Sequence, residues 1–89
     1  QTAMHIYETI QDYKGLAKTT AAKGIICLHT YKAHEALVYH WKAIQIKEEN
    51  LKNPDLSINY FNLAYAYYVI RQYAVAYHYF SKSYYSRIF

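Results

Sequence analysis

Residues 57–83 read SINYFNLAYAYYVIRQYAVAYHYFSKS, and the order of large and small residues in this stretch decides the fold. Its first half carries apolar residues at steps of three, one and three: Tyr60, Leu63, Ala64 and Tyr67. Its second half carries a set at steps of four and three: Ala76, Phe80 and Ser83. Steps of three and four place side chains on one face of an α-helix. The stretch therefore predicts two helices joined by a short turn at Arg71-Gln72.

The same pattern occurs forty residues earlier in the chain. Small residues align with small residues across this shift: Gly24 with Ala64, Ala36 with Ala76, and Ala43 with Ser83. The connecting segments align as well, since Tyr13-Lys14-Gly15 falls under Asn53-Pro54-Asp55. A third, partial copy precedes both: Ala3, Tyr7 and Ile10. No such unit buries its apolar face alone, so neighbouring units are expected to stack.

These repeats predict an all-α chain of about five antiparallel helices, whose small residues let paired helices approach closely. The expected helices cover residues 2–11, 13–30, 33–51, 54–70 and 73–88. Asp12 is the expected N-cap of the second helix. Asn53 followed by Pro54 marks the start of the fourth, because proline suits the first helical position.

The composition agrees with helices and excludes several other classes. Apolar residues make up 54% of the 89 residues, with two glycines and one proline, which are too few turn residues for a loop-rich or all-β chain. Cys27 is the single cysteine, so the fold does not depend on an internal disulfide. No stretch approaches the roughly 18 apolar residues of a membrane span. The net charge of +4 is spread evenly, without the basic cluster that nucleic-acid binding needs.

The aromatic, leucine, small and tyrosine positions of the second full copy resemble those of a tetratricopeptide repeat. The first full copy matches this pattern at Gly24, Cys27, Ala36 and Ala43. The resemblance implies an α-α superhelix with repeats at residues 13–52 and 53–89, preceded at residues 1–12 by the second helix of a truncated repeat. The period of forty residues exceeds the family's period of about 34, and the extra residues lengthen the helix that ends near Lys47-Glu48-Glu49-Asn50. We therefore expect a fragment of a longer array with an expanded repeat.

The resemblance also implies a binding groove, because the first helix of each pair lines the concave side of stacked pairs. The residues expected in this groove are Ile58, Phe61, Asn62, Tyr65 and Tyr68 on the last pair, with Lys18, Ile25 and His29 on the preceding pair. Many family members hold the backbone of an extended peptide with an asparagine at the position of Asn62, and a carboxamide both donates and accepts hydrogen bonds. A solvated asparagine on a helix face is the alternative interpretation.

Two features of the expected groove restrict the kind of ligand that it binds. Phe61, Tyr65 and Tyr68 would form an aromatic wall, although in a chain with 13 tyrosines such rings also serve packing. Family members that bind acidic tails hold a terminal carboxylate with paired Lys, Asn and Arg side chains. Lys18 and Asn62 are present here, but other positions of that clamp hold Ala21, Ala22 and Phe61. We therefore expect no chaperone-tail ligand.

Motifs that carry chemistry are missing from the sequence. His29, His34 and His40 do not share the spacing of metal ligands on one helix, so the histidines are expected at surface or packing positions. Cys27 lies at a helix-packing position and is expected to be a structural thiol. The sequence has no glycine-rich phosphate loop and no nucleophile elbow. We expect no enzyme activity, no cofactor and no metal site.

The expected function is that of a scaffold segment that binds a protein or peptide in the concave groove, without direct contact to nucleic acid or membrane. The alternative is a sensory or regulatory segment of a bacterial signalling protein or transcription regulator. A third interpretation is architectural, with self-association through exposed terminal helices, where no following helix covers Tyr84, Tyr85, Ile88 and Phe89. A cytoplasmic location is expected, with a periplasmic sensor segment as the alternative.

Overall fold

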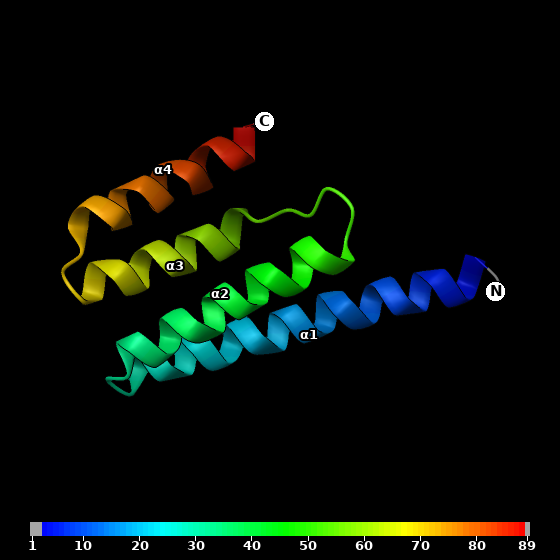
Figure 1. Cartoon of the computed structure of the whole chain (residues 1–89), viewed down its shortest axis with the longest axis horizontal. Helices are drawn as coiled ribbons and strands as arrows, with labels where there is room; N and C mark the ends of the chain where they lie inside the picture. The colour runs from blue at the N-terminus through cyan, green and yellow to red at the C-terminus, as the bar shows by residue number, and fades with distance from the viewer. Residues whose placement is uncertain (1–2, 89) are drawn as a thin grey trace.

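The computed structural model describes the backbone of residues 3–88 and the side chains of residues 8–86. Over this range the chain forms four α-helices and no strand: α1 (Ala3–His29), α2 (Ala33–Asn50), α3 (Ser57–Val69) and α4 (Tyr73–Ile88). They form two antiparallel hairpins, α1–α2 and α3–α4, which lie beside one another in chain order (Figure 1). The predicted all-α class is confirmed. No helix within the described range is long and apolar enough to span a membrane.

Helix α1 corrects the predicted number of helices. The break expected between residues 2–11 and 13–30 does not exist, and Asp12 lies inside a continuous helix rather than at an N-cap. Gly15 suggested a linker, but its φ is not positive, and a single glycine inside a helix costs only about 1 kcal/mol. Since no proline interrupts the segment, the helix continues. Its N-terminal part extends past the end of α2 (Figure 1).

The turns within the two hairpins have the same geometry at positions forty residues apart. Tyr31 and Arg71 adopt the left-handed conformation, with φ of 64° and 66°. In each turn the N–H of the next residue donates to the carbonyl five residues before it, at 2.8 Å in the first turn and 2.9 Å in the second. This pattern satisfies carbonyls that a helix end leaves open. The turns predicted at Tyr31-Lys32 and Arg71-Gln72 are confirmed.

Helix α3 begins at Ser57 rather than at the predicted residue 54. Asn53 has a φ of 50°, a left-handed conformation that no helix continues through. Oδ1 of Asp55 accepts hydrogen bonds from the N–H of Ser57 at 3.0 Å and from its hydroxyl at 2.8 Å. The Asp55 carboxylate therefore holds the first turn of α3, and the connection between the hairpins covers residues 51–56.

Small residues form the contact between the helices of the first hairpin. Ala36 and Ala43 of α2 are fully buried. Gly24 of α1 faces the imidazole of His40, and a Cβ at Gly24 would lie 2.7 Å from that ring. The close approach of α1 and α2 therefore depends on the missing side chain at Gly24.

The helices of the second hairpin also meet at small residues, and a hydrogen bond joins them in addition. Ala64 of α3 is fully buried and Ala76 of α4 is nearly so. The hydroxyl of Ser83 donates to the carbonyl of Ser57 at 2.7 Å. This buried bond joins α4 to the first turn of α3.

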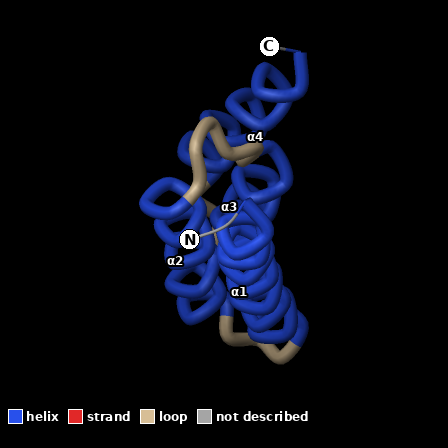
Figure 2. The backbone as a smooth tube through the Cα atoms, turned by 90° about the vertical axis from the view of Figure 1, so that its right-hand side faces the viewer, coloured by secondary structure: helices blue, strands red, loops and turns tan. Residues whose placement is uncertain are grey.

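Aromatic rings fill the space between the hairpins. Ile44 of α2 belongs to one buried core cluster with Tyr60 and Leu63 of α3. The ring of Tyr79, from α4, lies 5.9 Å from the rings of Tyr60 and Tyr67 and is close to parallel with both. Trp41 of α2 meets Tyr79 edge-on at 5.6 Å. The hairpins therefore stack mainly through α2 and α3, and α4 lies farthest from α1 (Figure 2).

Candidate functional site

A cavity of about 760 Å³ lies where α1, the end of α2, the connection and the start of α3 meet. Its walls come from three parts of the chain: Ile10, Lys14, Ala17, Lys18 and Ala21 of α1, then Lys47 and residues 50–55, and finally Ile58, Asn59 and Asn62 of α3. Protein clefts that hold ligands have volumes of roughly 300–1,000 Å³. This cavity is therefore large enough for more than a single ion or side chain.

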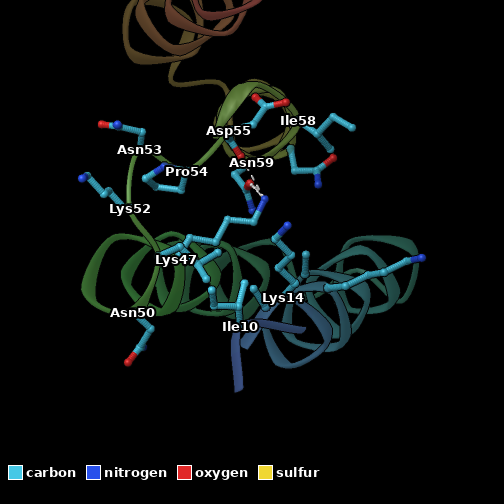
Figure 3. Close-up of a pocket in the computed structure, with 15 residues that line it drawn as sticks. Ile10, Lys14, Lys47, Asn50, Lys52, Asn53, Pro54, Asp55, Ile58 and Asn59 are labelled. Carbon is cyan, nitrogen blue, oxygen red and sulfur yellow. Dashed lines mark hydrogen bonds between the residues drawn. The ribbon is translucent and has the colours of Figure 1, made fainter. Parts of the chain in front are cut away.

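Lys47 joins the two hairpins at this cavity. It comes from the last turn of α2, and its Nζ donates to Oδ1 of Asn59 at 2.7 Å and to the backbone carbonyl of Asp55 at 3.0 Å. Figure 3 shows the Lys47 side chain reaching from α2 to Asn59. Asn59 is buried, so the position of the Lys47 ammonium is fixed by a side chain that is itself held by packing.

Lys14 and Lys47 place two positive charges at the same end of the cavity. The Lys14 side chain extends from α1 toward that of Lys47 (Figure 3). Burial lowers the pKa of Lys47 from its ordinary value of 10.5, while the nearby Asp55 raises it and the charge of Lys14 lowers it. A partly desolvated ammonium beside a like charge is stabilised by a negative neighbour. This end of the cavity therefore favours an anion.

Three of the predicted groove residues meet in this cavity: Lys18 from α1, with Ile58 and Asn62 from α3. Asn62 is half-buried, and its carboxamide makes no hydrogen bond within the described part of the chain. A carboxamide offers two N–H donors and one carbonyl acceptor. The groups that a peptide backbone requires are therefore open to a ligand at Asn62.

The predicted aromatic wall lies outside the cavity and divides into two places. Phe61 packs edge-on against Phe80 of α4, with ring centroids 5.4 Å apart. Tyr65 and Tyr68 lie next to each other at 6.5 Å, and Tyr68 meets Tyr73 edge-on at 5.5 Å. Phe61 and Tyr68 therefore pack against α4, and none of the three rings lines the cavity that Asn62 lines.

Ile25 and His29 are the remaining predicted groove residues. Both are exposed, and neither lines the cavity. Ile25 follows Lys18 by about two helical turns, so it lies toward the C-terminal end of α1. In the cavity the structure thus brings together Lys18, in the middle of α1, with Ile58 and Asn62, in the first half of α3.

Sequence reasoning missed Lys14, Lys47 and Asn59. The predicted groove used only the first helix of each pair, so Lys47, in the second helix, received no role. Lys14 fell in the expected linker, whereas the continuous α1 places it on a helix beside the cavity. The period of forty residues was the sequence feature that could have predicted the role of Lys47. The extra residues lengthen α2, so that Lys47 in its last turn lies beside the start of α3.

The histidines and the cysteine form no metal-binding group among the described residues. His29, His34 and His78 are exposed. His40 is buried, its Nδ1 has no hydrogen-bond partner in the described part of the chain, and burial lowers its pKa. Cys27 is half-buried and forms no disulfide there. His5 lies outside the described side chains.

No protein-family model matches this chain, and the searches of curated proteins and of solved structures found no match either.

Proposed function

We propose that this chain is a peptide-binding segment built from tetratricopeptide-like helix hairpins. The observation that carries the proposal is the cavity in which Lys18, Ile58 and Asn62 meet. These residues come from two helices, and the resemblance assigned all three to one groove. The repetition of the hairpin turn at Tyr31 and Arg71 supports the same interpretation, because equal turns forty residues apart are typical of stacked repeats.

In the proposed complex, a peptide lies in extended conformation between α1 and α3. The Asn62 carboxamide donates to a carbonyl of the peptide and accepts from an N–H, which holds the backbone without selecting a sequence. Ile58 is 64% exposed, and it offers apolar surface to one peptide side chain. The role is binding without a chemical step.

Selection from a random peptide library, displayed on phage, tests the proposal on the chain itself. Recovered peptides should shift the backbone amide resonances of Lys18, Ile58 and Asn62 in NMR titrations. Asn62→Ala should lower the affinity for these peptides about tenfold, because two neutral hydrogen bonds are lost. Gln45→Ala is the control, since Gln45 carries an exposed carboxamide on α2 and does not line the cavity.

Two results would count against the peptide groove. One is a selection that enriches no peptide. The other is a set of peptides that bind equally well to Asn62→Ala and shift only resonances of α4. Either outcome would remove Asn62 from the site.

We also propose self-association as a second role, because α4 carries large exposed rings. Tyr77, Tyr84 and Tyr85 are 74%, 61% and 58% exposed, and exposed aromatic groups of this kind mark interaction surfaces. Sedimentation velocity over a range of concentrations should show a dimer or larger species. A monomer at every concentration, with a cooperative melt that does not depend on concentration, would contradict this role.

A further inference from the structure

The lining of the cavity has an excess of positive charge. Four lysines line it: Lys14, Lys18, Lys47 and Lys52. Asp55 is the one acid among the lining residues, all of which belong to the described part of the chain. Its Oδ1 accepts from the backbone N–H and the hydroxyl of Ser57, and its charge also acts on Lys47, whose pKa it raises. One carboxylate therefore faces four ammonium groups, and the lining keeps a net positive charge.

Only two of the lysines converge in the interior. Figure 3 shows Lys14 and Lys47 extending toward each other beside Asn59, whereas the Lys52 and Asn53 side chains point away. An ammonium has three N–H donors, and Lys47 uses two of them, on Asn59 and on the Asp55 carbonyl. Lys14 makes no hydrogen bond within the described residues. Donors of both lysines therefore remain for a ligand.

We propose that Lys14 and Lys47 form a subsite for a carboxylate side chain of an acidic peptide that lies in the groove. This inference rests on the proposed function. It differs from the acidic-tail clamp discussed above, because neither lysine occupies a position of that clamp. Charge complementarity supplies the argument for the ligand, since two ammonium groups that extend toward each other are stabilised by a shared anion.

The shape of the cavity favours a peptide over a free anion. Its volume of about 760 Å³ continues from the two lysines to Ile58 and Asn62, far beyond what one phosphate or carboxylate would fill. A peptide places a carboxylate, a backbone amide and an apolar group in one chain. These three groups match the lysine pair, Asn62 and Ile58 in turn.

Fluorescence polarisation with three labelled peptides tests the subsite. In the first, Glu alternates with Ser; in the second, Gln replaces Glu; in the third, Lys replaces Glu. The acidic peptide should bind about tenfold or more tighter than its Gln counterpart, and the Lys peptide should not bind. Lys14→Gln should weaken the acidic peptide about two- to fivefold, as for an exposed ion pair, and Lys47→Gln about tenfold, as for a half-buried charged donor.

Lys23→Gln is the matched control. Lys23 is exposed on α1, as Lys14 is, and it does not line the cavity. The substitution removes the same charge, so a general effect of net charge would appear in both variants. Lys23→Gln should change the affinity less than about twofold at physiological salt. Thermal melting of Lys47→Gln and of the wild type shows whether this variant is folded. If it is unfolded, the affinity of Lys14→Gln alone tests the subsite.

Three outcomes would overturn the subsite. One is an equal loss of affinity in Lys14→Gln and Lys23→Gln. Another is binding of the Gln peptide as tight as that of the acidic peptide. If Asn62→Ala then lowers the affinity for the Gln peptide, the peptide groove is supported and only the carboxylate subsite is wrong. The third is a competition result: inorganic phosphate displaces the labelled acidic peptide at the same concentration as the unlabelled acidic peptide does. That result would show a site for free anions.

Discussion

Replacing Gly24 with alanine should destabilise the first hairpin, although alanine is the better helix former. A Cβ at Gly24 would lie 2.7 Å from Cε1, 2.8 Å from Nε2 and 3.0 Å from Nδ1 of His40. Favourable contacts need about 3.5–4.0 Å, so the imidazole, which is 1% exposed, must move through packed surroundings. Such overpacking costs about 1–3 kcal/mol, and the gain in helix propensity is about 1 kcal/mol. The net loss in the free energy of unfolding should be about 0–2 kcal/mol.

Gly15→Ala separates the two contributions. Gly15 lies in the same helix, and beyond its chain neighbours and the backbone of its own helix no atom is within 4 Å of the position of its Cβ. This variant should therefore be about 1 kcal/mol more stable than the wild type. Because both variants gain the same helix propensity, the difference between them is the cost of the His40 contact, about 1–3 kcal/mol. In a chain of this size each kcal/mol shifts Tm by roughly 4–8 °C.

Urea denaturation followed by far-UV circular dichroism measures both variants. The same two substitutions are then made in a His40→Ala background, where the ring is absent. There Gly24→Ala should lose its penalty and approach the effect of Gly15→Ala. Equal stabilisation by the two substitutions with His40 in place would refute the close contact of α1 and α2 at this point.

Three further predictions concern stability. Tyr31→Gly should raise the free energy of unfolding by about 0.5–1 kcal/mol, because Tyr31 is left-handed and 98% exposed; no gain in urea denaturation would argue against strain at this turn. The free energy of unfolding should fall as the pH drops below about 6.5, because burial lowers the pKa of His40 in the folded state and the unfolded chain takes up the proton first. Urea titrations between about pH 5 and 8 should show this slope, and His40→Phe should flatten it. Ser83→Ala should cost about 1 kcal/mol through loss of the bond to the Ser57 carbonyl, and an unchanged urea midpoint would show that this bond adds nothing.

The hairpins could be predicted because the signals are local and repeated. Small residues at Gly24, Ala36 and their partners forty residues later mark where two helices touch, and the structure buries them there. The turn at Tyr31 carries neither glycine nor proline, yet it was found, because the spacing of packed residues on both sides leaves a gap of only a few residues.

The ends and breaks of helices were predicted less well, because they depend on small energy differences. Gly15 looked like a linker residue, but its cost of about 1 kcal/mol inside a helix is less than the cost of a break, which leaves backbone groups at two helix ends without intrahelical partners even with Asp12 as a cap. Asn53-Pro54 looked like a helix start, yet the helix begins where the Asp55 carboxylate accepts from Ser57. Both outcomes depend on hydrogen bonds that residue spacing does not reveal.

The candidate site depends on the feature in which the sequence differs most from the tetratricopeptide pattern that it resembles. In a repeat of about 34 residues, the second helix would end before the position of Lys47. Here α2 continues to Asn50 and is followed by a connection over residues 51–56, and this added length supplies much of the cavity wall. Lys47 spans the gap to Asn59 only because of this extension. The expanded period therefore explains both the cavity and its charge, which the pattern of packed residues alone could not predict.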